Sequence, residues 1–218
     1  MVPARFRRLK QVLDRRQPDL SVLMDGVHKP HNFSAVLRTC DAVGVLRAHV
    51  VPVGELEPSR QIARGASRYV RVVRHRSLDA AVDRLREAGF AIVAAHPAPD
   101  APDFRELDYT VPTAVLLGTE LDGLSDEALA AADAAVRIPM LGAVTSLNVS
   151  VAAALILYEA QRQRQDAGMY DSRRLDDDTA RRLLFEWGYP RIARLCRRRG
   201  VPYPELGPEG EILGAVPR

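Results

Sequence analysis

The sequence has 218 residues, of which 47% are hydrophobic and 27% are charged, so it can bury one sizeable core with appendages. Its two cysteines, Cys40 and Cys196, exclude a disulfide framework, and its start lacks the apolar run that a signal peptide requires. We find no stretch that is apolar enough to span a membrane. These features predict a cytoplasmic protein without a membrane segment.

The charged residues are unevenly distributed, although the net charge is only +3. Residues 1–16 carry six basic side chains against one acidic, residues 162–200 carry eleven against six, and residues 17–161 carry 13 against 18. A further run from Arg60 to Arg76 holds six arginines and no acidic residue, which is typical of a basic surface. Lysine and arginine clusters bind phosphates largely without regard to sequence. The pattern favours basic arms that hold a polyanion beside an acidic body, although arginine-rich helices are also common solvated surfaces.

Short apolar strands and helices alternate along the chain. Strands are expected at 20–24, 48–53, 69–73, 90–95, 113–117 and 135–140. Helices are expected at 4–16, 33–43, 78–88 after an N-cap at Ser77, 126–132, and from 149 onward, with a polar loop or short helix between 53 and 69. This alternation predicts an α/β fold with a mostly parallel sheet and flanking helices, whose ligand site lies outside the carboxyl ends of the strands. After Gly168 we expect a pair of helices outside the sheet and a poorly ordered Pro/Gly-rich tail.

The segment 137–159 is the most informative single stretch. From Val149 to Leu157 only Ser150 is polar, and a helix that is apolar on every face lies in a core or an interface. Ser146 occupies the position expected of an N-cap. The free N–H groups of a buried helix start also provide a polar spot that can bind a ligand, so capping and ligand binding are both open.

Several common catalytic or binding patterns are absent. The segment from Gly118 to Ser125 has the glycine spacing of a phosphate-binding loop but has Leu124 in place of its lysine, and no G-x-G-x-x-G follows the first strand. No G-x-S-x-G elbow occurs. His28 and His31 lack nearby cysteine or carboxylate partners in the sequence, so we interpret them as loop residues and expect no metal.

Three polar clusters at predicted strand-to-helix junctions carry a resemblance to a known family. They are Asn32 followed six residues later by Arg38-Thr39, then Gly118-x-Glu120-x-x-Gly123-Leu124, then Ile138-Pro139-Met140 leading to Ser146-Leu147-Asn148-Val149-Ser150. In this order they resemble the three motifs of the SPOUT RNA methyltransferases, over roughly residues 20–161. Within that superfamily the sequence is most similar to the TrmH branch, whose enzymes methylate the 2′ oxygen of guanosine-18 in tRNA.

The resemblance implies a fold, a cofactor and partners. The fold would be an α/β sheet ending in a C-terminal deep trefoil knot, which spacing alone does not predict. The chain would comprise a basic N-terminal helical extension at 1–19, a SPOUT methyltransferase domain at 20–166, and a C-terminal helical extension with a tail at 167–218. S-adenosyl-L-methionine would bind in the knot, at positions that match Leu117, Gly118, Ile138, Met140 and Leu147. The implied partners are tRNA and a second copy of the chain.

The same resemblance implies five catalytic residues: Asn32, Arg38, Glu120, Ser146 and Asn148. The family's proposed base matches Arg38, but a guanidinium has a pKa above ~12 and rarely gives up a proton. We therefore expect Arg38, oriented by Asn32, to stabilise the developing alkoxide by its charge, while Glu120 and Asn148 position the loops and the cofactor.

Two alternatives remain open from the sequence. An enzyme of the same fold could methylate a ribose in rRNA or at another tRNA position, and a non-catalytic RNA-binding protein could use the same basic arms. Binding of the cofactor would separate an enzyme from a binding protein, and nucleoside mapping would identify the RNA. The sequence does not decide which tRNAs are substrates, or whether the run from Arg60 to Arg76 contacts RNA.

Overall fold

The computed structural model describes residues 1–52 and 68–216, which divide into two units. One unit is Gln17–Met169, and the other combines Met1–Arg16 with Tyr170–Arg218. Within the described residues, no helix combines the length and apolar character needed to cross a membrane. The predicted loop or helix between 53 and 69 lies almost entirely outside the described residues, as do Arg60 and Arg64.

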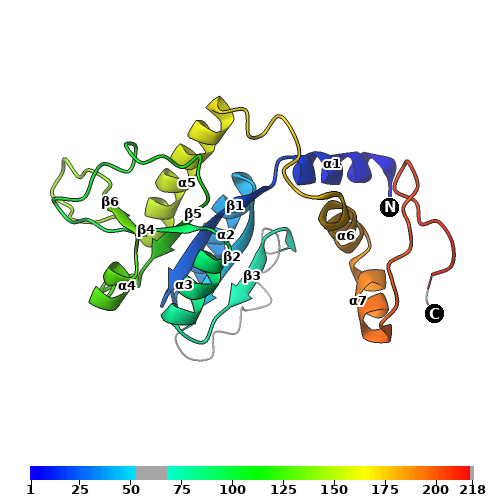
Figure 1. Cartoon of the computed structure of the whole chain (residues 1–218), viewed down its shortest axis with the longest axis horizontal. Helices are drawn as coiled ribbons and strands as arrows, with labels where there is room; N and C mark the ends of the chain where they lie inside the picture. The colour runs from blue at the N-terminus through cyan, green and yellow to red at the C-terminus, as the bar shows by residue number, and fades with distance from the viewer. Residues whose placement is uncertain (53–67, 217–218) are drawn as a thin grey trace. The chain divides into compact units, whose positions relative to one another are not determined.

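The unit Gln17–Met169 is built on a six-stranded parallel sheet with the strand order β3-β2-β1-β5-β4-β6 (Figure 1). Its strands are β1 (Gln17–Asp25), β2 (Val45–Val51), β3 (Arg71–Arg74), β4 (Ala91–Ala95), β5 (Thr113–Leu117) and β6 (Ala134–Val136). Every pairing among these strands is parallel. The α/β fold with a parallel sheet, predicted from the alternation of elements, is confirmed.

Helices cover both faces of this sheet. The helices are α2 (Pro30–Ala42), α3 (Leu78–Glu87), α4 (Asp126–Ala130) and α5 (Val149–Asp166). One core cluster joins α2 and α5 to one face, with Val22, Val36 and Ile156 fully buried, and a second joins α3 and α4 to the other, with Leu23 and Leu116 fully buried. Because β5 is buried along its whole length, the two clusters meet along the middle of the sheet.

A buried arginine fixes the end of α5 to the amino edge of the sheet. The Arg164 side chain is fully buried and donates to Asp19 Oδ1 at 2.7 Å and to the carbonyl oxygens of Tyr109, Asp19 and Val111 at 2.8, 3.1 and 3.0 Å. A further bond of 3.1 Å reaches Gln17 Oε1. A buried guanidinium is tolerated only when it is paired and hydrogen-bonded in this way.

The second unit contains three helices, α1 (Pro3–Asp14), α6 (Asp177–Gly188) and α7 (Pro190–Arg199). The Arg16 guanidinium lies 5.3 Å from the ring centroid of Trp187 on α6. The predicted pair of helices after Gly168 is confirmed. The prediction of a poorly ordered tail is wrong for its described part, because Leu206 bridges Ile212 and the Tyr189 hydroxyl donates to the Gly210 carbonyl at 2.8 Å.

Element boundaries differ from prediction at two functional positions. The strand expected at 135–140 ends at Val136, because the chain leaves the sheet there and Pro139 lacks the N–H that a ladder needs. The N-cap of α5 is Asn148 rather than Ser146: its side chain accepts a hydrogen bond from the Ser150 N–H at 2.8 Å. By contrast, Ser77 caps α3 as predicted, accepting from the Ala80 N–H.

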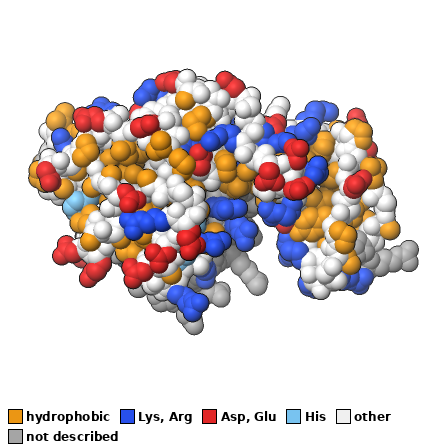
Figure 2. Space-filling view, in the orientation of Figure 1, with side chains coloured by type: hydrophobic (Ala, Val, Ile, Leu, Met, Phe, Trp, Pro, Cys, Tyr) orange, Lys and Arg blue, Asp and Glu red, His pale blue; other side chains and the backbone are white. Residues whose placement is uncertain are grey.

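The charge asymmetry of the sequence is visible on the surface. Figure 2 shows acidic side chains gathered over the part of the sheet unit that carries α3 and α4. The second unit carries exposed basic side chains on α1 and α7, including Arg7, Arg8, Arg191 and Arg198.

Candidate functional site

A cavity of about 350 Å³ lies at the carboxyl edge of the sheet. Three segments form it: the end of β4, the turn after β5, and the connection from β6 to α5. Its lining residues are Ala95, His96, Pro97, Leu117, Gly118, Thr119, Glu120, Leu121, Asp122, Gly123, Val136, Ile138, Met140, Thr145, Ser146, Leu147, Val149 and Ala152. This is the edge at which parallel sheets bind ligands, and the volume is within the range of small-molecule sites.

The turn after β5 brings two glycines into close contact. The Thr119 N–H donates to the Gly123 carbonyl at 2.8 Å, and a Cβ added at Gly118 would lie only 2.1 Å from that carbonyl oxygen. Gly123 has a φ of 71°, which L side chains rarely adopt. The two glycines are therefore needed to fold the segment back on itself, and this turn carries Glu120 at its tip.

A polar network links three predicted catalytic residues beside this cavity. Asn32, which is 1% exposed in the first turn of α2, donates from Nδ2 to Glu120 Oε1 at 2.9 Å. Asn148, at the N-cap of α5, donates from Nδ2 to Asn32 Oδ1 at 3.1 Å. The network joins residues that are 88 and 116 positions apart, because β1 and β5 are neighbours in the sheet.

The Glu120 carboxylate is surrounded by donors. Burial alone would raise its pKa, but the hydrogen bonds from Asn32 and from the Lys29 N–H, at 3.1 Å, together with nearby His28, hold the pKa below its ordinary value. The second oxygen, Oε2, lies 3.0 Å from His28 Nδ1 but receives no well-directed hydrogen bond from any described residue. Glu120 is therefore an anion at neutral pH whose remaining acceptor capacity is directed toward His28.

The other two predicted catalytic residues lie apart from this network. Ser146 is exposed and lines the cavity. Arg38 lies on α2, is exposed, and makes no hydrogen bond or ion pair with any residue in the described ranges. Six residues separate it from Asn32, so on a helix the two side chains point in different directions. An exposed cation without a partner in the described structure is available to an external anion.

The predicted cofactor residues all lie around one cavity. Leu117 and Gly118 line it from the end of β5, Ile138 and Met140 from the loop after β6, and Leu147 from the loop before α5. Their role in binding stays a prediction.

Three residues of the candidate site were not predicted from the sequence. His96 and Pro97 line the cavity from the end of β4, and only the rule that carboxyl ends of parallel strands share an edge points to them. His28 lies in a loop as predicted, but the prediction that it has no carboxylate partner is wrong, because it contacts Glu120. Because that partner lies 92 positions away, no local pattern predicts the contact.

The fold and this site define the class of protein. A parallel α/β sheet with a ligand cavity at its carboxyl edge, bordered by a buried carboxylate and two carboxamides, is the arrangement of an α/β enzyme that holds a small molecule beside a polar substrate.

Comparison with known proteins identifies the family. Residues 19–158 match the SpoU rRNA Methylase family, and residues 162–215 match the C-terminal segment of SpoU rRNA methylases. The chain therefore belongs to the SpoU methylase family.

Relatives and solved structures agree with this assignment. The chain is 51% identical to the tRNA (guanosine(18)-2′-O)-methyltransferase of Escherichia coli (strain K12) over 97% of this chain and 94% of the relative. The crystal structure of the A. aeolicus TrmH/SpoU tRNA modifying enzyme matches with a TM-score of 0.80 and 41% identity, covering 86% of this chain and 96% of that one. The SpoU methyltransferase AviRb from Streptomyces viridochromogenes, solved in complex with AdoMet, matches with a TM-score of 0.61 and 32% identity, covering 70% and 62%.

Proposed function

We propose that this protein transfers a methyl group from S-adenosyl-L-methionine to the 2′ oxygen of guanosine-18 in tRNA. The observation that carries the proposal is the Glu120–Asn32–Asn148 network at the edge of a cavity of about 350 Å³, in a chain that is 51% identical to an enzyme of this activity. The network supplies fixed polar groups beside a space that can hold a cofactor.

The residues present fit the cofactor. The cavity combines apolar side chains, Leu117, Ile138 and Leu147 among them, with the backbone of three loops. Such a lining suits an adenine ring held by backbone groups, and the close approach at Gly118 leaves no side chain in the way. When bound, S-adenosyl-L-methionine supplies an electrophilic methyl group. The Glu120 carboxylate, which lines the cavity, would supply negative charge to balance the positively charged sulfonium of the cofactor.

The chain's own residues have two tasks in this reaction. The first is positioning: Asn32 and Asn148 hold the turn at Glu120 and the start of α5 in a fixed relation, which reduces the entropy lost in aligning the substrate. The second is charge: the ribose oxygen gains negative charge as it attacks the methyl group and its proton passes to water. The exposed cation of Arg38 can bind the neighbouring phosphate and stabilise that oxygen. Because a guanidinium retains its proton, we assign Arg38 an electrostatic role.

We extend the proposal to the path of the chain. A deep trefoil knot formed by the loops after β5 and β6 would bring both loops to one cavity, and both do line it. Mechanical unfolding of the full chain tests this, because a knotted chain cannot be extended to its full contour length.

A second copy of the chain is the proposed partner for α5. In the described chain the helix buries Ile156 and Leu157 but exposes Val151, Leu155 and Tyr158 by 46, 40 and 53%. These three recur at spacings of four and three residues and so form one stripe, and an exposed apolar stripe on a helix marks an interface. This stripe supports the homodimer expected from the apolar sequence of the helix.

The proposed division of labour assigns methyl transfer to residues 20–166 and RNA binding to the extensions at 1–19 and 167–218. Support comes from a hollow of about 580 Å³ on α7, which Arg191, Arg194, Arg197 and Arg198 line. Of these, Arg197 is 3.1 Å from Glu186, whereas Arg191 and Arg198 form no ion pair with any described residue. Uncompensated arginines of this kind bind phosphates.

As a tRNA-modifying enzyme, the protein would act in the cytoplasm.

Incubation with labelled cofactor and separate tRNA and rRNA pools, followed by nucleoside mapping, tests the activity. Label at guanosine-18 of tRNA is the expected result. Label confined to rRNA or to another tRNA position would refute the substrate assignment, and cofactor binding without transfer to any pool would refute the activity. Removing residues 1–16 should weaken tRNA binding and flatten its dependence on salt while leaving cofactor affinity unchanged.

A further inference from the structure

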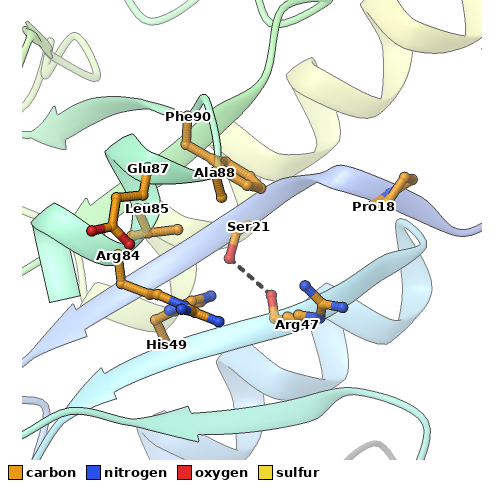
Figure 3. Close-up of a pocket in the computed structure, with 9 residues that line it drawn as sticks. All are labelled: Pro18, Ser21, Arg47, His49, Arg84, Leu85, Glu87, Ala88 and Phe90. Carbon is orange, nitrogen blue, oxygen red and sulfur yellow. Dashed lines mark hydrogen bonds between the residues drawn. The ribbon is translucent and has the colours of Figure 1, made fainter.

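A second cavity, of about 290 Å³, lies on the face of the sheet that α3 covers. It is lined by the first half of β1, by β2, and by the C-terminal half of α3 with Phe90, and it shares no residue with the cavity at the carboxyl edge. Figure 3 shows Arg84 extending from α3 toward His49 on β2, with Ser21 and Arg47 beside them. We call this cavity the basic pocket.

Two arginines and one glutamate are the charged side chains that line the basic pocket. Arg47 and Arg84 are both exposed at its rim, and Arg71 on β3 is in register with Arg47 on the neighbouring strand. Arg84 makes no hydrogen bond or ion pair with any described residue. Glu87 is the acidic side chain in the lining, and it is not paired with Arg84. The pocket therefore favours an anion.

Two histidines beside these arginines have lowered pKa values. His49 is 7% exposed, and its Nδ1 lies 2.8 Å from Nε2 of His75, with the rings stacked at a centroid distance of 5.0 Å. Burial, followed by the positive charges of His75, Arg47 and Arg84, lowers the pKa of His49 to about 4. A bound anion would oppose both arginines and would raise that pKa.

The inner wall of the basic pocket is apolar. Leu85, which is 1% exposed, lies behind this wall, and Pro18, Ala88 and Phe90 form the surface against which a flat ring can pack. Ser21 is fully engaged in the sheet, since its hydroxyl donates to the Arg47 carbonyl at 2.9 Å. An apolar wall beside two guanidinium groups matches a molecule with one ring system and one phosphate.

We propose that the basic pocket binds a nucleotide, with its phosphate between Arg47 and Arg84 and its base against Phe90 and Ala88. The nucleotide is either a unit of an RNA strand or a free mononucleotide, since both present the same groups. The proposal is independent of methyl transfer, because the basic pocket shares no lining residue with the cavity assigned to that reaction.

The test titrates the full chain with guanosine 5′-monophosphate, inorganic phosphate and guanosine, and follows the His49 imidazole signals by NMR. The charged and titratable side chains around the pocket are Arg47, Arg71, His75, Arg84 and Glu87. The monophosphate should shift the His49 signals and raise the pKa of His49, whereas guanosine should not. Inorganic phosphate should bind more weakly. Equal binding of inorganic phosphate and the monophosphate would overturn the assignment to a nucleotide.

Two variants on one helix localise the effect. Arg84→Gln should weaken the binding of guanosine 5′-monophosphate by about tenfold, which is the usual loss of affinity for one charge-assisted contact. Arg86→Gln is the matched control, because Arg86 points elsewhere and pairs with Asp133 at 2.7 Å. If both variants bind the monophosphate like the wild type, or if the His49 signals do not respond, no nucleotide binds there.

Kinetics with tRNA separates the two sources of the nucleotide. If the pocket holds a unit of an RNA strand, Arg84→Gln should raise the KM for tRNA severalfold with kcat and cofactor Kd unchanged. If it holds a free mononucleotide, the same variant should lose monophosphate binding and keep the tRNA KM. Either result supports nucleotide binding in the basic pocket, and neither result depends on which nucleoside is methylated.

Discussion

Replacement of Asn32 by leucine tests whether the polar network holds the site together. Asn32→Leu keeps a side chain of similar size in a position that is 1% exposed but removes two hydrogen bonds. Glu120 Oε1 would retain only the bond from the Lys29 N–H. The loss of a hydrogen bond to a charged group costs about 1.5–3 kcal/mol, and the bond to the exposed Asn148 adds less because water can replace it. We expect a destabilisation of about 2–3 kcal/mol.

The pH dependence of this loss identifies Glu120 as its source. The pKa of Glu120 is lower in the folded chain than its ordinary value, so the bonds to it stabilise the fold fully above that value, near 4.5. This stabilisation disappears as the pH falls through the folded-state pKa. In Asn32→Leu the carboxylate has one donor fewer and its pKa rises. The difference between wild type and variant should therefore be largest near neutral pH and should narrow in acid.

Urea unfolding at a fixed protein concentration, at several values between about pH 7 and about pH 3, provides both readouts. His31→Leu is the matched control, because His31 is the preceding residue and is exposed, without a partner in the described ranges. It should change stability by less than about 0.5 kcal/mol. If the two variants are equally stable at neutral pH, or if the difference does not narrow in acid, the network does not carry the energy assigned to it.

Three further substitutions test other parts of the structure. Arg164→Leu should destabilise the fold by about 3–5 kcal/mol, because it leaves Asp19 without its buried partner. The same change at Arg162, whose side chain is 59% exposed, should cost about 1 kcal/mol or less. Similar urea midpoints for both variants would contradict this. Leu155→Glu should convert a dimer to a monomer in sedimentation, and Leu213→Glu, in the other unit, should not; a monomeric wild type would exclude the proposed interface. Arg38→Lys should keep part of the single-turnover activity with an unchanged pH–rate profile, whereas a shift toward lower pH would indicate a general base.

The layered fold could be predicted because its signals are local. The run at 113–117 is apolar at four of its five positions, which is typical of a strand buried on both faces, and β5 has those bounds. Ser77 followed by an amphipathic run predicts α3 and its cap, and both occur. Each of these signals depends on residues within one element, so no knowledge of the tertiary arrangement is required.

The partners of Glu120 could not be predicted, because they depend on strand order. Asn32 and Lys29 approach it only because β1 lies beside β5, an order that alternation alone does not specify. The N-cap of α5 has a similar cause. Ser146 and Asn148 are both good capping residues, and the path of the loop after β6 decides between them.

The composition of α5 illustrates a different limit. A helix that is apolar on every face predicts burial without telling which partner covers each side. In the structure one side packs on the sheet through Ile156 and Leu157, and the other exposes Val151, Leu155 and Tyr158. The same apolar sequence therefore forms a surface that faces the core and an exposed stripe, and only the three-dimensional structure distinguishes them.

The turn after β5 connects the ligand cavity with the polar network. Thr119, Leu121 and Gly123 line the cavity, and Glu120, between them, holds Asn32 and through it Asn148. The turn can adopt only a narrow set of conformations because Gly118 and Gly123 lie in contact. A ligand in the cavity therefore meets a surface whose shape is already fixed by hydrogen bonds from α2. The two glycines that resemble a phosphate-binding loop in the sequence have a different role here, which is to place the Glu120 carboxylate beside the cavity.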